Sequence, residues 1–396
     1  MRRILFAVIG CFTVFCAHSA QIVNVDYVHK LIAQEWDISV PIKTDNIMAA
    51  VNMKYLLTAV DVANEILNGE RTTDYGNGEF ATLHAADTIA TNTAVETLVR
   101  KIDKGPEFTL TTTPDTTSFS FKISAAGEFV VDWGDGTVET ITKANTTTTT
   151  YSHTYNTAGT YTIGLSGQAT AYNTDTYTAA INFYVGSNTS TKETNVKKIA
   201  SIDGSLGAIF GTLSSDTNNQ PRFYQTFYNA SNMTGSIPEN LFAGISGAPA
   251  SYMFYGTFYN CSGLTSIPDG LFAGISGAPA ESMFAYTFFG CSGLTGAIPD
   301  GLFGNLTGAP ASNMFRQTFY NCSGLTSIPE NLFGNISGTA QYQMFSRTFY
   351  NCTSLTGPSA RINGQYLYEI WYAALWATYK GCTGLSDYAN IPSDWK

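Results

Sequence analysis

A nine-residue phrase recurs six times in the second half of the chain, and this repetition constrains the fold more than any other feature. Its clearest copy begins at Thr257 and reads Thr-Phe-Tyr-Asn-Cys-Ser-Gly-Leu-Thr. The six copies begin at Thr226, Thr257, Thr287, Thr318, Thr348 and Thr378. The steps between them are 31, 30, 31, 30 and 30 residues. A fixed period of this size is typical of a solenoid, in which each unit buries its apolar face against its neighbours. The repetition predicts a scaffold and points away from enzyme chemistry.

The first 20 residues have the layout of a secretory signal peptide. Arg2 and Arg3 precede a mostly apolar run over 4–17, and the small residues Ser19 and Ala20 close the segment. No second apolar run is long enough to span a bilayer. We therefore expect a protein that is secreted, periplasmic or at the cell surface, with no membrane span after signal removal. A retained membrane anchor is the alternative.

The charge of the chain excludes one class of partner. The formal net charge is -10, and only 13% of the residues are charged. An acidic chain with few Lys and Arg is a poor binder of nucleic acid, because neutralising phosphates requires clustered cations. We expect a protein or glycan partner on another cell or surface, no nucleic acid and no cofactor.

Residues 21–105 carry the pattern of a small helical module. Over 47–67, apolar residues recur at spacings of three and four, and Gly69 follows as a stop signal. A second helix is expected over 86–102. The sequence leaves open whether this module is a bundle, a stalk or an oligomerising collar.

From residue 107 the pattern changes to alternation of apolar and polar residues in short runs. Phe119, Phe121 and Ile123 form one such run, and others follow up to Val185. Period two with turn residues between runs predicts an antiparallel β-sandwich over 107–186. The polar stretch 187–195 predicts a linker.

Two pieces of this segment resemble the signature stretches of the PKD domain. They are Val131-Asp-Trp-Gly-Asp-Gly-Thr and His153-Thr-Tyr-Asn-Thr-Ala-Gly-Thr-Tyr-Thr-Ile, although Asp132-Trp133 replaces the usual centre of the first. The resemblance implies an immunoglobulin-like all-β sandwich that serves as a spacer or interaction module in exported proteins. Trp133 would lie in its core.

The repeat unit predicts two short helical pieces and one strand. Met253, Phe254, Phe258 and Cys261 fall close to one face of a helix. A strand over 264–267 and a second helical turn over 269–275 follow. One acidic residue occurs after proline in four successive repeats: Glu239, Asp269, Asp300 and Glu330. We interpret these acids as helix starts that meet the helix dipole.

The string Phe-x-x-Cys-Ser-x-Leu-Thr-x-Ile-Pro is similar to the BspA-like class of leucine-rich repeats, which occurs on bacterial surface proteins. The similarity covers about 196–396 and implies an α/β leucine-rich-repeat-type solenoid with six repeats and caps. The units here are longer than that class usually shows, by an inserted Asp-Gly-Leu-Phe-Ala-Gly-Ile segment. Because of this difference, we do not infer a ligand from the resemblance.

The cysteines after residue 20 occupy the same position in successive repeats. They are Cys261, Cys291, Cys322, Cys352 and Cys382. Their odd number and identical register favour a structural ladder of small buried apolar side chains over disulfides. These cysteines show no Cys-x-x-Cys spacing, which would have suggested a metal site.

Few residues qualify as a site. Asp132 and Asp135 are weak candidates for Ca²⁺ ligands, with turn formation as the alternative. We predict no catalytic residue. The candidates for ligand binding come from positions that vary between the repeats: Tyr224, Tyr255, Tyr286, Arg316 and Arg347.

The favoured function is that of an exported, non-enzymatic binding or adhesion protein that presents its repeats for protein or glycan recognition. One alternative is a structural or assembly subunit with an oligomerising helical module. Another is a secreted carbohydrate-active enzyme or its accessory module.

Overall fold

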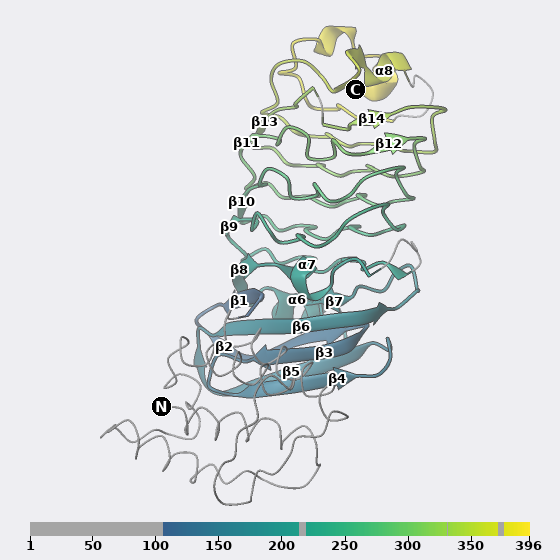
Figure 1. Cartoon of the computed structure of the whole chain (residues 1–396). Helices are drawn as coiled ribbons and strands as arrows, with labels where there is room; N and C mark the ends of the chain where they lie inside the picture. Colours follow the sequence, from purple (N-terminus) through teal and green to yellow (C-terminus); the bar gives the residue numbers. More distant parts are fainter. Residues whose placement is uncertain (1–105, 214–218, 331, 371–375) are drawn as a thin grey trace, which may run out of the picture. The chain divides into compact units, whose positions relative to one another are not determined.

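The computed structural model describes residues 106–213, 219–330, 332–370 and 376–396 (Figure 1). The chain divides into two units, 1–105 and 106–396, and the described residues all belong to the second. The expected signal peptide over 1–20 and helical module over 21–105 lie outside the described residues. Among the described residues, no helix is long and apolar enough to cross a membrane.

Two antiparallel sheets form the first part of the described chain. The larger has the strand order β4-β3-β6-β1-β8, and the smaller has the order β5-β2-β7. The strands of the larger sheet are β1 (Phe108–Thr112), β3 (Ala125–Asp132), β4 (Val138–Lys143), β6 (Thr162–Tyr172) and β8 (Ile199–Gly204). Those of the smaller sheet are β2 (Thr116–Ile123), β5 (Thr149–Gly159) and β7 (Ile181–Asn182).

The apolar side chains of these strands alternate as the sequence predicts. Phe119, Phe121 and Ile123 on β2 are all 0% exposed. Phe129 and Val131 on β3 are also buried. Period-two burial is the signature of strands with one face on a core.

The expected linker over 187–195 is wrong, because this stretch forms helix α6 (Thr189–Val196). Asn188 caps the helix by accepting a hydrogen bond from the backbone N–H of Thr191 at 3.0 Å. The side chain of Asn195 donates to the backbone oxygens of Ser120 and Phe183, each at 2.9 Å. The buried Asn195 therefore satisfies sheet backbone, whereas most other polar residues of the stretch are exposed.

The domain boundary expected at residue 196 falls at the end of helix α6, just before strand β8, and both belong with the sheets. Strand β8 follows α6 and pairs with β1 as an edge strand of the larger sheet. The first repeat then continues from the sheets, because the N–H of Phe183 donates to the oxygen of Thr226 at 3.0 Å. The rings of Phe183 and Phe227 stack at 5.2 Å.

Each repeat contributes one turn segment to a stack of hydrogen-bonded layers. The turn segments span 222–230, 252–261, 282–291, 313–322, 343–352 and 376–382. The N–H groups of Phe254 and Phe258 donate to the next layer, at 2.8 and 2.9 Å. Those of Thr257 and Cys261 donate to the carbonyl three residues back, at 3.2 and 3.1 Å. Because alternate amides bond between and within layers, the buried backbone keeps its partners.

Every fourth residue of a turn segment has a positive φ. Tyr252, Gly256 and Asn260 have φ values of 59°, 57° and 55°. Gly and Asn tolerate this left-handed conformation best, which explains the Asn of the recurring phrase. The backbone therefore repeats every four residues. Phe254 and Phe258 point into the core, whereas Tyr255 and Tyr259 are half-buried on the opposite side.

Short strands complete the layers. Parallel pairs join β9 to β10, β11 to β13 and β12 to β14. Their ranges are β9 (Gly235–Ser236), β10 (Leu264–Ser266), β11 (Gly296–Ala297), β12 (Thr307–Gly308), β13 (Leu325–Ser327) and β14 (Asn335–Ile336). The last part contains β15 (Arg361–Ile362), β16 (Gln365–Tyr366), α8 (Leu367–Ile370) and the short 3₁₀ helices η3 (Tyr388–Asn390) and η4 (Ser393–Trp395).

The expected fold class as a whole is therefore wrong, and the α/β leucine-rich-repeat-type solenoid is not found. The described residues between 219 and 366 contain turns and strands of two or three residues, but no helix. Helices α7 (Leu206–Ile209) and α8 lie before and after them. A left-handed residue at every fourth position interrupts the i to i−4 bonding that a helix needs.

The acids that follow proline are consequently not helix starts. Glu239, Asp269, Asp300 and Glu330 are exposed and lie in turns. No helix dipole meets their charges.

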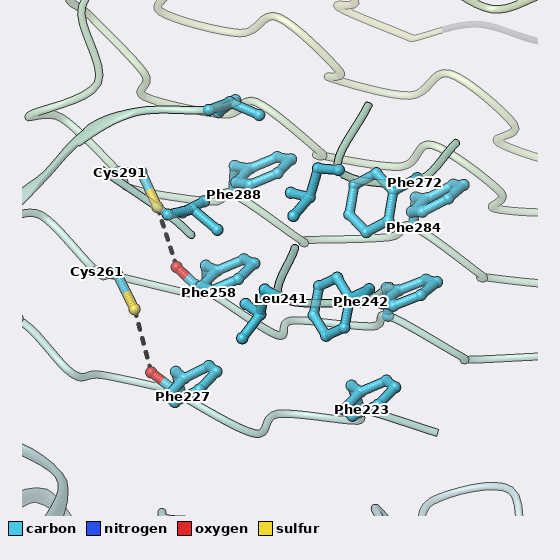
Figure 2. Packing of buried hydrophobic residues seen from close by; sticks show 14 of the residues in the cluster. Phe223, Phe227, Leu241, Phe242, Phe258, Cys261, Phe272, Phe284, Phe288 and Cys291 are labelled. Atoms are coloured by element: carbon cyan, nitrogen blue, oxygen red, sulfur yellow. Dashed lines mark hydrogen bonds between the residues drawn. The ribbon is translucent and has the colours of Figure 1, made fainter. Parts of the chain in front are cut away.

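The core of the layers consists of stacked phenylalanines (Figure 2). Phe227, Phe258 and Phe288 form one column, with neighbouring ring centroids 5.6 Å apart and interplanar angles of 6° and 3°. Phe242 and Phe272 belong to another column and stack at 5.8 Å. Each layer therefore offers the next a flat apolar surface.

The five cysteines are free and buried, and their thiols have hydrogen-bond acceptors. The Sγ of Cys261 lies 3.1 Å from the oxygen of Phe227 in the preceding layer, and that of Cys291 lies 3.0 Å from the oxygen of Phe258 (Figure 2). Burial raises the pKa of the Cys261 thiol well above its usual value, so the thiol keeps its proton. The side chain therefore acts as a donor to a buried carbonyl as well as an apolar filler.

A pair of substitutions at Cys322 separates these two roles. Its Sγ lies 3.0 Å from the oxygen of Phe288. We expect Cys322→Val to lower the free energy of unfolding by about 1 kcal/mol more than Cys322→Ser, because valine removes one of the two donors to this oxygen and leaves only the N–H of Cys291, at 3.1 Å. Urea denaturation of both variants measures the difference. A valine variant as stable as the serine variant would contradict the donor role.

Candidate functional site

The residues predicted for ligand binding lie on one half-buried surface of the layers. The ring centroids of Tyr224 and Tyr255 are 5.1 Å apart, and those of Tyr255 and Tyr286 are also 5.1 Å apart. The guanidinium of Arg316 lies 5.6 Å from the centroid of the Tyr286 ring. The structure thus brings four of the five predicted residues into one row.

Arg347 continues this row into the following layers. The N–H of Gln317 donates to the oxygen of Ser346 at 2.9 Å, which places Arg347 in the layer after Arg316. Its guanidinium lies 4.9 Å from the centroid of the Trp376 ring. Trp376 is 62% exposed, so its indole is accessible at this end of the surface.

A second row of aromatic rings runs beside the first and was missed by the sequence analysis. Neighbouring rings in this row stack at 4.4 to 5.0 Å. Its members are Tyr184, Tyr228, Tyr259, Phe289, Tyr320 and Tyr350. The rows meet where the Tyr286 ring lies 6.0 Å from Phe289 and 6.3 Å from Tyr259. We call both rows together, including Tyr177, Tyr252 and Trp376, the aromatic face.

A signal for the missed row is present in the phrase itself. The third residue of Thr-Phe-Tyr-Asn-Cys is Tyr or Phe in five copies and Lys380 in the sixth. These residues were given no binding role from the sequence alone, because they belong to the recurring phrase. With a backbone period of four, Tyr259 shares the exposed position of Tyr255, and the buried position belongs to Phe258.

The N-terminal end of the face is extended by the sheets. Tyr177 is 60% exposed, and its ring makes edge contacts with Tyr224 at 5.8 Å and Tyr252 at 5.1 Å. Tyr184 follows β7 and begins the second row. Both parts of the described chain therefore contribute to one surface.

Two tyrosines of the face, Tyr228 and Tyr255, have a raised pKa and stay neutral at physiological pH. Burial and then the neighbouring Tyr259 raise the pKa of Tyr228 to about 12. Burial also raises the pKa of Tyr255, and Tyr286 and Tyr224 raise it further, whereas Arg316 opposes the shift. The face consequently offers uncharged hydroxyl groups and ring edges.

The ends of the second row carry positive charge. The Nζ of Lys192 lies 5.7 Å from the Tyr184 ring, and that of Lys380 lies 5.8 Å from the Tyr350 ring. Such cation–π contacts hold a cation over a ring without neutralising it.

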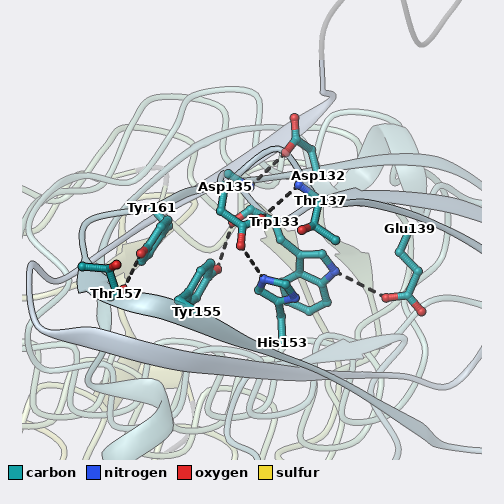
Figure 3. Close-up of polar contacts among 10 residues, drawn as sticks. Asp132, Trp133, Asp135, Thr137, Glu139, His153, Tyr155, Thr157 and Tyr161 are labelled. Atoms are coloured by element: carbon teal, nitrogen blue, oxygen red, sulfur yellow. Dashed lines mark hydrogen bonds and ion pairs between the residues drawn. The ribbon is translucent and has the colours of Figure 1, made fainter. Parts of the chain in front are cut away.

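The two acids proposed for Ca²⁺ are used in turns (Figure 3). Asp132 accepts from the N–H of Gly134 at 2.9 Å, and Asp135 accepts from that of Thr137 at 3.0 Å. The other oxygen of Asp135 lies 2.7 Å from His153 Nε2. No group of three His, Cys, Asp or Glu suited to a metal occurs within the described ranges.

The Asp135–His153 pair has a structural environment. The His153 ring stacks on Trp133 at 5.1 Å and meets the edge of Tyr155 at 4.7 Å. Burial opposes ionisation of Asp135, but the bonds from His153 and Thr137 outweigh it and lower the pKa of this carboxyl. The pair fixes the turn between β3 and β4 against β5.

Comparisons with known proteins add no relative. A scan against family models, a search of curated proteins and a search of solved structures each found no match.

Proposed function

We propose that this chain is an exported, non-enzymatic recognition protein that binds a protein or glycan through the aromatic face. The observation that carries the proposal is the continuity of half-buried rings across five layers and onto the sheets. Contiguous exposed aromatic surface on a folded protein marks a binding site more often than chance, because water solvates it poorly.

The scaffold under the face supports this role. Its rings are fixed by stacking and by interlayer hydrogen bonds, so a ligand would meet a surface that is already ordered. Preorganisation lowers the entropic cost of association. Rigid aromatic anchors are also the side chains most enriched at the centres of interfaces.

The sequence resemblances favour an exported location. The signal-like segment over 1–20, the PKD-like stretches and the BspA-like phrase are all typical of proteins outside the cytoplasm. The fold expected from the last resemblance is not part of this proposal.

A binding panel of glycans and extracellular proteins tests the proposal. The double variant Tyr255→Ala, Tyr286→Ala should lose a ligand that the unaltered chain binds. Tyr342→Ala is the matched control, because Tyr342 is 69% exposed and lies outside both rows. Equal loss in the control, or a ligand that neither variant affects, would place the binding surface elsewhere.

A further inference from the structure

We infer that the C-terminal end of the aromatic face binds an acidic glycan, a chain of sugars carrying carboxylate or sulfate groups. This inference deepens the proposed function and rests on it. It concerns Arg316, Arg347 and Lys380, which we call the cationic end of the face.

The three cations occupy three consecutive layers. Arg316 belongs to the turn segment 313–322, Arg347 to 343–352 and Lys380 to 376–382. The N–H of Arg347 donates to the oxygen of Trp376 at 3.0 Å, which ties the second layer to the third. Only six Lys and Arg residues follow residue 218, so three of them in successive layers is a strong concentration on a chain of net charge -10.

These cations lack acidic partners. None of the three forms an ion pair with a described Asp or Glu; the pairs in the described chain are His153 with Asp135 and Lys197 with Glu193. They lie over rings instead, Arg316 over Tyr286, Arg347 over Trp376 and Lys380 over Tyr350. The Nε atoms of both arginines are buried without a hydrogen-bond partner.

This arrangement fits an anion from outside the chain. A guanidinium held over a ring keeps its planar fork in place for bidentate contact with a carboxylate or sulfate. Arg316 and Arg347 are half-buried and Lys380 is exposed. An incoming anion therefore meets cations that are only partly desolvated and has no acidic side chain to displace.

The rings beside the cations favour a glycan over an acidic peptide. The exposed Trp376 indole and the half-buried Tyr320 and Tyr350 rings offer apolar surface to the sugar rings beside the charges.

The test measures binding of polygalacturonate and chondroitin sulfate to the whole chain at several salt concentrations. The carboxyl-reduced form of polygalacturonate and poly-glutamate serve as comparison probes. The variant combines Arg316→Ser with Arg347→Gln. Ser346 occupies the position in its layer that Arg316 occupies in the preceding one, and Gln317 occupies the position equivalent to Arg347. The backbone therefore accepts serine and glutamine at these positions. Arg361→Gln is the matched control, because Arg361 also lies over a ring, at 4.3 Å from Tyr366, outside the face.

We expect at least one acidic glycan to bind, to weaken as salt increases and to bind the double variant about 100-fold less tightly, or tenfold per charge-assisted contact. The control should bind as the unaltered chain does. Equal affinity of the double variant and the control would overturn the inference. So would binding of the reduced polymer with equal strength, or binding of poly-glutamate alone.

The failure of this inference differs from the failure of the proposed function. If neither acidic glycan binds, but another ligand is lost on Tyr255→Ala, Tyr286→Ala, the aromatic face is the binding surface and the acidic class is wrong. If no ligand depends on those tyrosines, both are wrong.

Discussion

Replacing Phe258 with alanine is expected to lower the free energy of unfolding by about 3–5 kcal/mol. The side chain is 0% exposed, and its ring stacks between Phe227 and Phe288 at 5.6 Å on both sides. Its loss opens a cavity in the middle of a ring column whose backbone is held by interlayer hydrogen bonds. Such a site collapses poorly, which places the cost in the upper part of the range for large-to-small changes. Equilibrium denaturation in urea measures it.

The adjacent residue provides the matched control for this prediction. Tyr259 lies next in the chain and stacks on Tyr228 and Phe289 at 4.5 and 4.4 Å, but on the half-buried side. Tyr259→Ala should cost about 1–3 kcal/mol, from two ring pairs at roughly 0.5–1.5 kcal/mol each. A larger loss for Tyr259→Ala than for Phe258→Ala would reverse our assignment of core and face.

The stretch 107–186 should not fold when it is produced alone, whereas residues 106–396 should unfold in a single transition. The fragment lacks β8, which covers the edge of β1, and it lacks Phe227, which stacks on Phe183. The rings of Phe183 and Phe108 would then lose the Phe227 ring that packs on both of them. Exposed apolar core and an unpaired strand edge both remove stability.

A longer fragment tests the reason for this expectation. Residues 106–213 regain β8 and the contact of Phe210 with Phe129 at 5.5 Å, but still lack Phe227. Circular dichroism should show more strand structure in this fragment than in 107–186, and a lower melting temperature than in 106–396. Cooperative melting of 107–186 by itself would contradict the coupling between sheets and layers.

The sequence predicted the strands better than the repeats, for a physical reason. The alternation of apolar and polar residues over 116–132 fits strands with one buried face, and β2 and β3 lie in this range. In the repeats, apolar residues at Phe254, Phe258 and Cys261 recur at spacings of four and three. Those spacings suit a helix, and they suit equally a turn segment whose backbone repeats every four residues.

A helix and this turn segment differ in their backbone φ angles, which the types of side chain indicate only weakly. Asn260 is a residue that often adopts positive φ, but Tyr286 and Arg347 adopt it as well, at 60° and 55°. Interlayer hydrogen bonds impose that conformation on them. No pattern within one repeat reveals this, because the constraint comes from the neighbouring layer.

The candidate site was predictable only in part. Variation between repeats indicated Tyr255, Tyr286 and Arg316, which the structure brings together. The second row was hidden because its residues belong to the recurring phrase and resemble scaffold. The helix α6 was hidden for the opposite reason, since its polar residues resemble a solvated linker, yet Asn195 bonds to the sheets.

The separation of turn segments from strands has a consequence for how this protein can change in length. The two repeats of 31 residues carry their extra residue at Gly235–Ser236 and Gly296–Ala297, in β9 and β11, outside the turn segments. Among the parallel strand pairs of the repeats, the register shifts occur in the pairs that contain β9 and β11. Duplication or loss of a whole unit would therefore lengthen or shorten the recognition surface in steps of about 4.8 Å. Copy number therefore sets how many layers the aromatic face spans.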